Sequence, residues 1–432
     1  MQFAEGYLFS TLSYQLPKNV LPTQLYPKLW LMTTTHQKVS RLLQDMSESA
    51  TIKMAQLARE LAAEGHNVIS LSLGEPDFDT PDHIKEAAKQ ALDDGYTKYT
   101  PVPGLIELRQ AISKKFKRDN GLDYAPGQIV VSNGAKQSIA NLSLSLLDPG
   151  DEVIIFAPFW VSYLEIIRMS GAEPIIVTAG IEQDYKITAD QLRAALTDRT
   201  RMVLFSSPCN PTGSVYTQEE LEALADVLRD HEQVTVVSDE IYEYINFTGA
   251  HASIGTCDAV RDRTVTVNGF SKGYSMTGWR LGYMGAPQWI ANACAKIQGQ
   301  FTSGANAFGQ KAAVEALMGD MGPTEHMREA FLKRRDIVLD LLNDIPGMKV
   351  NRPMGAFYVF PEISSFFGKS SGEYTIENSD DFCTYLLQKG HVGTVAGSAF
   401  GLEGTFRLSY AASEEDLREA MARIKRACAE LR

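Results

Sequence analysis

Short apolar runs that alternate with helical patterns between residues 129 and 285 constrain the fold of this chain most strongly. Most runs are followed by a polar turn and then by a segment whose apolar residues recur at helical spacing. Strands of a parallel sheet are apolar throughout, because helices cover both faces of the sheet. The pattern therefore predicts an α/β fold with a mostly parallel central sheet sandwiched by helices, with strands at 129–131, 153–156, 174–177, 202–205, 234–237, 264–267 and 281–285.

The chain is long enough to require a second structural unit, because its 432 residues exceed what one hydrophobic core usually supports. Beyond residue 315, long helical patterns surround short strands near 356–360 and 405–408, which predicts a smaller α+β domain. We expect four segments: a disordered or irregular extension at 1–40, the N-terminal part of the small domain at 41–81, a large ligand-binding domain at 82–320 and the C-terminal part of the small domain at 321–432.

Composition argues against several classes of protein. The formal net charge of -12 argues against a nucleic-acid-binding surface, because such surfaces are usually basic. The five cysteines are scattered and form no C-x-x-C pair, which argues against disulfides and against a metal site and favours the cytoplasm. We expect no membrane-spanning segment, because the sequence contains no run of 18 apolar residues. The first thirty residues show neither a signal-peptide pattern nor a helical or strand period, so we expect a disordered extension that lies upstream of a true start at Met32.

Polar motifs follow the fourth, fifth and sixth predicted strands. Asn210 lies in PCNPTG, Asp239 in SDEIYE and Lys272 in SKGYSMTGWR. Ligands of a parallel sheet bind at the carboxyl ends of its strands. We therefore expect these three motifs to converge on one site.

Lys272 and Asp239 offer complementary chemistry. A lysine held among small residues can attack a carbonyl if burial or a nearby cation such as Arg280 lowers its pKa. The alternative interpretation is that Lys272 is an ordinary, solvated loop lysine. An aspartate that ends a buried strand needs a cationic partner, either a protonated pyridine nitrogen or a structural arginine. Tyr242 lies on the same side as Asp239 if the chain turns helical there.

Two further strand ends suit a flat, anionic ligand. Gly134 opens a strand-to-helix turn whose free N–H groups favour an anion, although many such turns carry a glycine. Trp160 in APFW is either a stacking platform or a core residue. A lysine able to form an imine, an aspartate for a pyridinium and an anion-binding helix terminus together describe a site for pyridoxal 5′-phosphate (PLP).

These motifs resemble those of the class I/II (fold type I) PLP-dependent aminotransferases, in particular the bacterial aspartate and aspartate/prephenate aminotransferases. The resemblance runs from about Ser49 to the C-terminus. It implies that Lys272 holds PLP as an internal aldimine and then moves the substrate Cα proton, while Asp239 keeps the pyridine nitrogen protonated. Tyr242 and Asn210 resemble the pair that hydrogen-bonds the phenolic oxygen of the ring.

The resemblance implies further cofactor contacts within the large domain. Trp160 is similar to the aromatic residue stacked on the ring, and Tyr99 in KYTPVPG resembles a tyrosine that reaches the phosphate of a neighbouring subunit, which implies a homodimer. The phosphate-binding positions are matched by Gly134, Ala135, Ser271 and Arg280.

Substrate contacts are implied in the same way. Arg407 in FRLSYA looks like the arginine that clamps the substrate α-carboxylate, with the Gly74 backbone opposite. Lys136, also expected among the cofactor contacts, and Thr51 resemble residues that contact the distal carboxylate of aspartate or glutamate. The expected substrate-binding set is Thr51, Gly74, Lys136, Trp160, Asn210 and Arg407.

The resemblance implies transfer of the amino group of L-aspartate to 2-oxoglutarate in two half-reactions. Ser47-Glu48 replaces a Lys-Pro pair that is frequent in the subgroup, which argues against prephenate as a substrate. The same motifs also allow an aminotransferase for aromatic amino acids, arogenate or alanine, a PLP-dependent C–S lyase, or a non-catalytic regulator on the same fold. The small-molecule partners expected of the aminotransferase are amino and keto acids.

Overall fold

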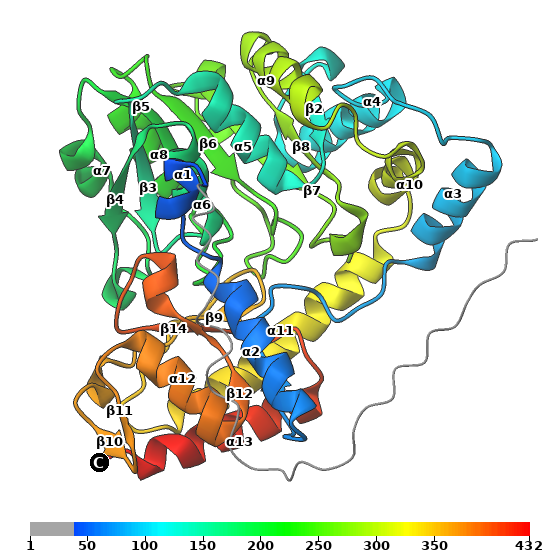
Figure 1. The fold of residues 1–432 in the computed structure, drawn as a ribbon. Coiled ribbons are helices and arrows are strands. Elements are labelled where there is room, and N and C mark those ends of the chain that lie inside the picture. Colours follow the sequence, from blue (N-terminus) through cyan, green and yellow to red (C-terminus); the bar gives the residue numbers. More distant parts are fainter. Residues whose placement is uncertain (1–38) are drawn as a thin grey trace, which may run out of the picture. The chain divides into compact units, whose positions relative to one another are not determined.

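The computed structural model describes residues 39–432 of the chain (Figure 1). The start expected at Met32, and almost all of the expected extension, lie outside these residues. The chain divides into two compact units, Met1–Met46 and Ser47–Arg432. In the described part of the first unit the chain forms a short helix, α1 (Arg41–Asp45).

A seven-stranded sheet forms the centre of the second unit, in the order β2-β8-β7-β6-β5-β3-β4. Neighbouring strands from β7 to β4 run parallel, and only β8 is antiparallel to its neighbours β2 and β7. The predicted mostly parallel sheet is therefore confirmed. Its strands are β2 (Ile129–Ser132), β3 (Glu152–Ala157), β4 (Glu173–Thr178), β5 (Thr200–Ser206), β6 (Thr235–Asp239), β7 (Thr264–Gly269) and β8 (Gly282–Gly285).

Helices cover both faces of this sheet (Figure 1). Alternate strand residues point to opposite faces: Ile155 packs with α5 (Ala135–Leu146), α6 (Ser162–Met169) and α9 (Gln288–Phe301), whereas Ile154 packs with α7 and α8. A further core on β2 and β8 contains side chains of three other helices. The remaining helices named here are α3 (Asp82–Asp93), α4 (Ile106–Lys115), α7 (Ala189–Ala195), α8 (Gln218–Leu228) and α10 (Ala307–Met318).

A second layer of structure is built mainly from the C-terminal third of the chain. Its core joins Phe331, Tyr385 and Ile424 to Leu71, which comes from the N-terminal part of the second unit. This packing supports the proposed small α+β domain, whose boundaries stay a prediction. Its elements are α2 (Ala50–Ala63), β1 (Ile69–Ser70), α11 (Gly322–Asn343), β9 (Tyr358–Val359), β10 (Ser370–Ser371), β11 (Tyr374–Thr375), α12 (Ser379–Gly390), β12 (Val392–Gly393), β13 (Val395–Ala396), β14 (Phe406–Ser409) and α13 (Glu414–Glu430).

No helix within residues 39–432 combines the length and the apolar character needed to cross a membrane. All five cysteines are buried and none forms a disulfide.

The N-terminus of α5 approaches strand β8 closely, and a glycine permits the approach. A Cβ atom at Gly282 would lie 2.2 Å from the backbone nitrogen of Ala135, the first residue of α5. Gly134, just before it, has a φ of 89°, a conformation that favours glycine. These two glycines therefore fix where the free N–H groups of α5 point.

Gly282→Ala is expected to displace α5 from β8, because the added methyl group meets backbone atoms that cannot rotate away. Overpacking of this kind costs about 1–3 kcal/mol. Urea denaturation should show this loss in the free energy of unfolding. Gly278→Ala is the matched control, because a Cβ there meets nothing within 4 Å. Equal stability of the two variants would contradict this account of the contact.

Candidate active site

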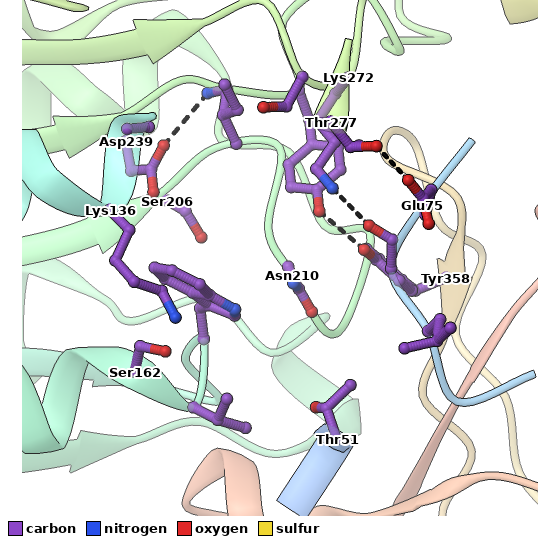
Figure 2. Close-up of a pocket in the computed structure, with 18 of the residues that line it drawn as sticks. Thr51, Glu75, Lys136, Ser162, Ser206, Asn210, Asp239, Lys272, Thr277 and Tyr358 are labelled. Carbon is purple, nitrogen blue, oxygen red and sulfur yellow. Dashed lines mark hydrogen bonds between the residues drawn. The ribbon is translucent and has the colours of Figure 1, made fainter. Parts of the chain in front are cut away.

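A cavity of about 340 Å³ lies where strands β5, β6 and β7 end (Figure 2). The polar motifs predicted to converge do so, since Asn210, Asp239 and Lys272 all line it. Figure 2 shows these three side chains around the same hollow, with Lys136 and Thr51 at other points of its wall. The cavity is also lined by Gly74, Ala135, Trp160, Tyr242, Ser271, Arg280 and Arg407.

Lys272 presents a desolvated amine to this cavity. Its Nζ donates a hydrogen bond to the carbonyl oxygen of Gly74, and it lies 5.8 Å from the ring centre of Tyr242 and 5.7 Å from that of Phe357. Burial lowers the pKa of Lys272 to about 8, with Arg407 and Arg280 acting in the same direction and Glu75 opposing them. At pH 7 roughly a tenth of Lys272 is therefore a neutral, nucleophilic amine, a far larger share than in an ordinary lysine with a pKa of about 10.4.

Asp239 ends strand β6 as a buried carboxylate. Its Oδ2 accepts a hydrogen bond from the Tyr163 hydroxyl at 2.6 Å, and its Oδ1 accepts one from the Ile241 N–H at 3.2 Å. Burial raises the pKa of Asp239 to about 6, although both hydrogen bonds lower it. Both donors are neutral, so the carboxylate keeps a negative charge that a cationic group in the cavity can neutralise.

The N-terminus of α5 and Arg280 form a positive corner of the cavity. Gly134 precedes α5 without any side-chain cap, and its backbone lies so close to Arg280 that a Cβ would meet the Nη2 atom at 2.4 Å. Arg280 itself is held by the carbonyl oxygen of Thr277, which accepts from Nη1 at 2.9 Å. Uncapped N–H groups beside a guanidinium bind anions such as phosphate. Ala135, the first residue of α5, and Ser271 also line the cavity.

Arg407, on β14, is almost fully buried, with 2% of its surface exposed. Its Nη1 donates to Asn210 Oδ1 at 2.9 Å, and its Nη2 donates to the carbonyl oxygen of Ser72. Its guanidinium also lies 4.6 Å from the ring centre of Tyr358. Among the described residues no acceptor binds its buried Nε. The guanidinium therefore has donor capacity left for a carboxylate in the cavity.

Tyr242 and Gly74 lie against the same tyrosine. The hydroxyl groups of Tyr242 and Tyr358 are 2.7 Å apart (Figure 2). A Cβ at Gly74 would lie 2.3 Å from the Tyr358 hydroxyl, so only glycine fits there. The structure thus brings both residues to the cavity, and it adds Tyr358 as a partner that the sequence motifs did not indicate.

Lys136 and Thr51 both line the cavity, and Lys136 lies next to Trp160. The Nζ atom of Lys136 lies 4.8 Å from the ring centre of Trp160. Burial and the charge of Arg280 lower the pKa of Lys136. The indole ring thus holds a cation beside the cavity.

Two predicted site residues, Gly134 and Tyr99, do not line this cavity. Gly134 directly precedes Ala135, which does line it, whereas Tyr99 has 99% of its surface exposed in the described chain. Its expected role in a neighbouring subunit stays a prediction. Tyr163, Tyr358 and Glu75 line the cavity but were not predicted. The WVSY motif offered a signal for Tyr163, because a residue three positions after Trp160 lies on the same side of a helix.

A separate buried cluster of Glu240, Glu243 and His251 has the composition of a metal site. However, the side chains of this cluster already bind one another and a neighbouring lysine. Glu240 accepts from His251 at 2.9 Å, and Glu243 forms an ion pair with buried Lys115. Burial lowers the pKa of His251, but Glu240 outweighs it and raises that pKa above its ordinary value. The three side chains are therefore held by a hydrogen bond and an ion pair inside the protein.

The lowered pKa of Lys272 can be measured directly. Acetylation of the ligand-free protein over a pH series, read by mass spectrometry, should give a midpoint near 8 for Lys272, well below the pKa of about 10.4 of an ordinary lysine. Arg407→Gln should move the midpoint upward, because it removes a cation that disfavours the charged amine. Exposed Lys389 serves as the internal reference for reagent reactivity. A midpoint for Lys272 that coincides with that of Lys389 would contradict the electrostatic description.

Comparisons with known proteins agree with this geometry. The sequence model of the family described as aminotransferase class I and II matches residues 66–424. The aspartate/prephenate aminotransferase of Cereibacter sphaeroides is 48% identical, covering 91% of this chain and 99% of the relative, and that of Nitrosomonas europaea is 46% identical, covering 90% and 98%.

Solved structures give the same result. The aspartate aminotransferase from Rhizobium meliloti superimposes with a TM-score of 0.89 at 42% identity, over 91% of this chain and all of that chain. The aspartate aminotransferase from Thermus thermophilus, solved with maleate, superimposes with a TM-score of 0.85 at 41% identity, over 90% and 100%. The chain therefore belongs to the aminotransferase class I and II family and is an aminotransferase.

Proposed function

We propose that this aminotransferase binds pyridoxal 5′-phosphate and transfers the amino group of L-aspartate to 2-oxoglutarate, giving oxaloacetate and L-glutamate. One observation carries the proposal. A desolvated amine, a desolvated carboxylate and a buried guanidinium with an unused donor, from Lys272, Asp239 and Arg407, line the same cavity.

The chemical groups around the cavity fit this cofactor. Lys272 would bind its aldehyde, Asp239 its protonated ring nitrogen, and the α5 N-terminus with Arg280 its phosphate. The Gly134 cradle supports the last assignment, because a Cβ there would fill the space beside Arg280. When bound, the cofactor supplies an electrophilic carbon and a ring that withdraws electrons from the substrate Cα.

The residues of the chain then hold the substrate and move its proton. Lys272, once its amine is released, would take the proton from the substrate Cα and return it, which suits an amine with a pKa of about 8. Tyr242 and Asn210 would hydrogen-bond the phenolic oxygen of the cofactor ring. Trp160 would limit the position of that ring from one side of the cavity.

Recognition of a dicarboxylate follows from two cations on the cavity wall. Arg407 would bind the α-carboxylate with the Gly74 backbone opposite, and Lys136 with Thr51 would bind the distal carboxylate. The names of the relatives support aspartate as a substrate, and the maleate in the Thermus structure is itself a four-carbon dicarboxylate.

The assembly and compartment are proposals of the same kind. We propose a homodimer in which the exposed Tyr99 contributes to the site of the other subunit. Such a role explains why a large aromatic side chain is fully exposed in a single chain.

We also propose that the protein works in the cytoplasm, where buried thiols such as those of its five cysteines stay reduced.

Prephenate is the second candidate substrate, because the names of two relatives include it. Ser47 and Glu48, both exposed, stand where a Lys-Pro pair is frequent in that subgroup, so we propose that prephenate is a poorer substrate than 2-oxoglutarate. Aromatic amino acids and alanine are weaker candidates because they have no second carboxylate for Lys136 to bind. Arogenate carries the same ring carboxylate as prephenate and is a weaker candidate for the same reason as prephenate. A C–S lyase would release pyruvate and ammonia without any keto-acid acceptor.

The substrate assignment is tested with native protein and Lys136→Ala on a panel of amino donors. Native protein should have its highest kcat/KM for L-aspartate. Loss of one charge-assisted hydrogen bond should lower that value roughly 10–100-fold in Lys136→Ala. The kcat/KM for alanine should change little, which makes alanine the control substrate. A native preference for phenylalanine or alanine, or an equal loss on every donor, would contradict the assignment.

A further inference from the structure

The hydrogen bond between Tyr163 and Asp239 joins two buried side chains from different elements. Tyr163 lies in the first turn of α6 and is 1% exposed, while Asp239 is the last residue of β6 and is 4% exposed. The oxygen atoms are 2.6 Å apart. Burial, together with Asp239, raises the pKa of the Tyr163 phenol well above its ordinary value. The phenol therefore keeps its proton and donates it, and the carboxylate accepts.

The Tyr163 hydroxyl offsets part of the free-energy cost of burying the charged Asp239 carboxylate. Burial raises the pKa of the Asp239 carboxyl to about 6, and the Tyr163 hydroxyl is the strongest of the influences that lower it. Hydrogen bonds to a carboxylate from neutral donors favour its charged form without neutralising it. The titratable groups that face Asp239 from the surrounding elements are Tyr163, Cys209, Glu240, Tyr242 and Lys272.

Tyr163 also fixes the orientation of the carboxylate. Oδ2 is held by Tyr163 and Oδ1 by the Ile241 N–H, so the carboxyl group cannot rotate without breaking both hydrogen bonds. Each oxygen of a carboxylate can accept more than one hydrogen bond. Asp239 can therefore accept a further hydrogen bond from a donor in the cavity that it lines.

The same tyrosine packs against the proposed stacking residue. The rings of Tyr163 and Trp160 meet edge to face, with centres 5.5 Å apart and an interplanar angle of 88°. Such a contact adds to the stability of the pair beyond its buried area. One side chain in α6 therefore touches both Asp239 and Trp160, which line the same cavity.

We propose that Tyr163 is a positioning residue for the cofactor: it holds the Asp239 carboxylate charged and aimed at the ring nitrogen, and it supports Trp160 at the side of the ring. This inference rests on the proposed function, because the ring nitrogen is that of PLP. In this proposal Tyr163 acts through these two residues.

The test is the affinity of the apoprotein for PLP, measured by tryptophan fluorescence over a pH series from below to above the pKa of Asp239. In Tyr163→Phe the Kd at neutral pH should rise about tenfold, the effect of one lost hydrogen bond to a charged group. The pH below which affinity falls should move upward, because Asp239 without its donor takes up a proton at higher pH. Native protein that fails to bind PLP would overturn both the proposed function and this inference.

Tyr385→Phe is the matched control. Tyr385 is fully buried and also donates one hydrogen bond, to the carbonyl oxygen of Ala427 at 2.9 Å, but it does not line the cavity. Its loss should leave the Kd for PLP and its pH dependence unchanged. If Tyr163→Phe binds PLP as native protein does, with the same pH dependence, the inference is wrong while the proposed function stands.

A double-mutant cycle separates hydrogen bonding from packing. In an Asp239→Asn background, Tyr163→Phe should change the Kd for PLP less than it does in native protein, because the carboxylate it supports is gone. An equal fold-change in both backgrounds would overturn the role through Asp239.

If Tyr163→Phe fails to fold, Tyr163→3-fluorotyrosine keeps the ring and hydroxyl with a more acidic phenol. It should move the pH midpoint of PLP binding downward, and an unchanged midpoint would overturn the inference.

Discussion

The desolvation of three charged side chains in one cavity is the constraint on which the rest of the site depends. Lys272 and Arg407 are cations and Asp239 is a carboxylate, and within residues 39–432 their hydrogen bonds lead only to neutral groups. Burying charge without a charged partner costs free energy. A ligand that brings an aldehyde, a cationic ring nitrogen and carboxylates would offset this cost, and the proposed pair of PLP and a dicarboxylic amino acid brings all of these groups.

The fold places these charges through its topology. Parallel strands β5, β6 and β7 end at one edge of the sheet, so residues far apart in the sequence meet there. The antiparallel strand β8 returns beside β7 and, with glycine at 282, lets the N-terminus of α5 approach the same edge. Arg407 comes from β14 in the C-terminal core, so in the proposed function the α-carboxylate and the cofactor would be bound by different layers of the structure.

The sequence allowed the central sheet to be predicted, because its strands are apolar runs bounded by turns; the run at 264–267, for example, lies within β7. Helices α9 and α10 were not predicted, since both contain many alanines that weaken the apolar period. Strands β12 and β13 have two residues each, too few for an alternating pattern. Tyr163 was missed because a tyrosine on an amphipathic helix is typical of a core, and only the distance to Asp239 reveals the hydrogen bond.

The central claim is that the amine of Lys272 binds the cofactor. Incubation of the protein with PLP, reduction with borohydride and peptide mapping by mass spectrometry would fix any carbon–nitrogen bond between them in a stable form. The account predicts a pyridoxyl group on Lys272. A label on exposed lysines alone, or none after reduction, would contradict it.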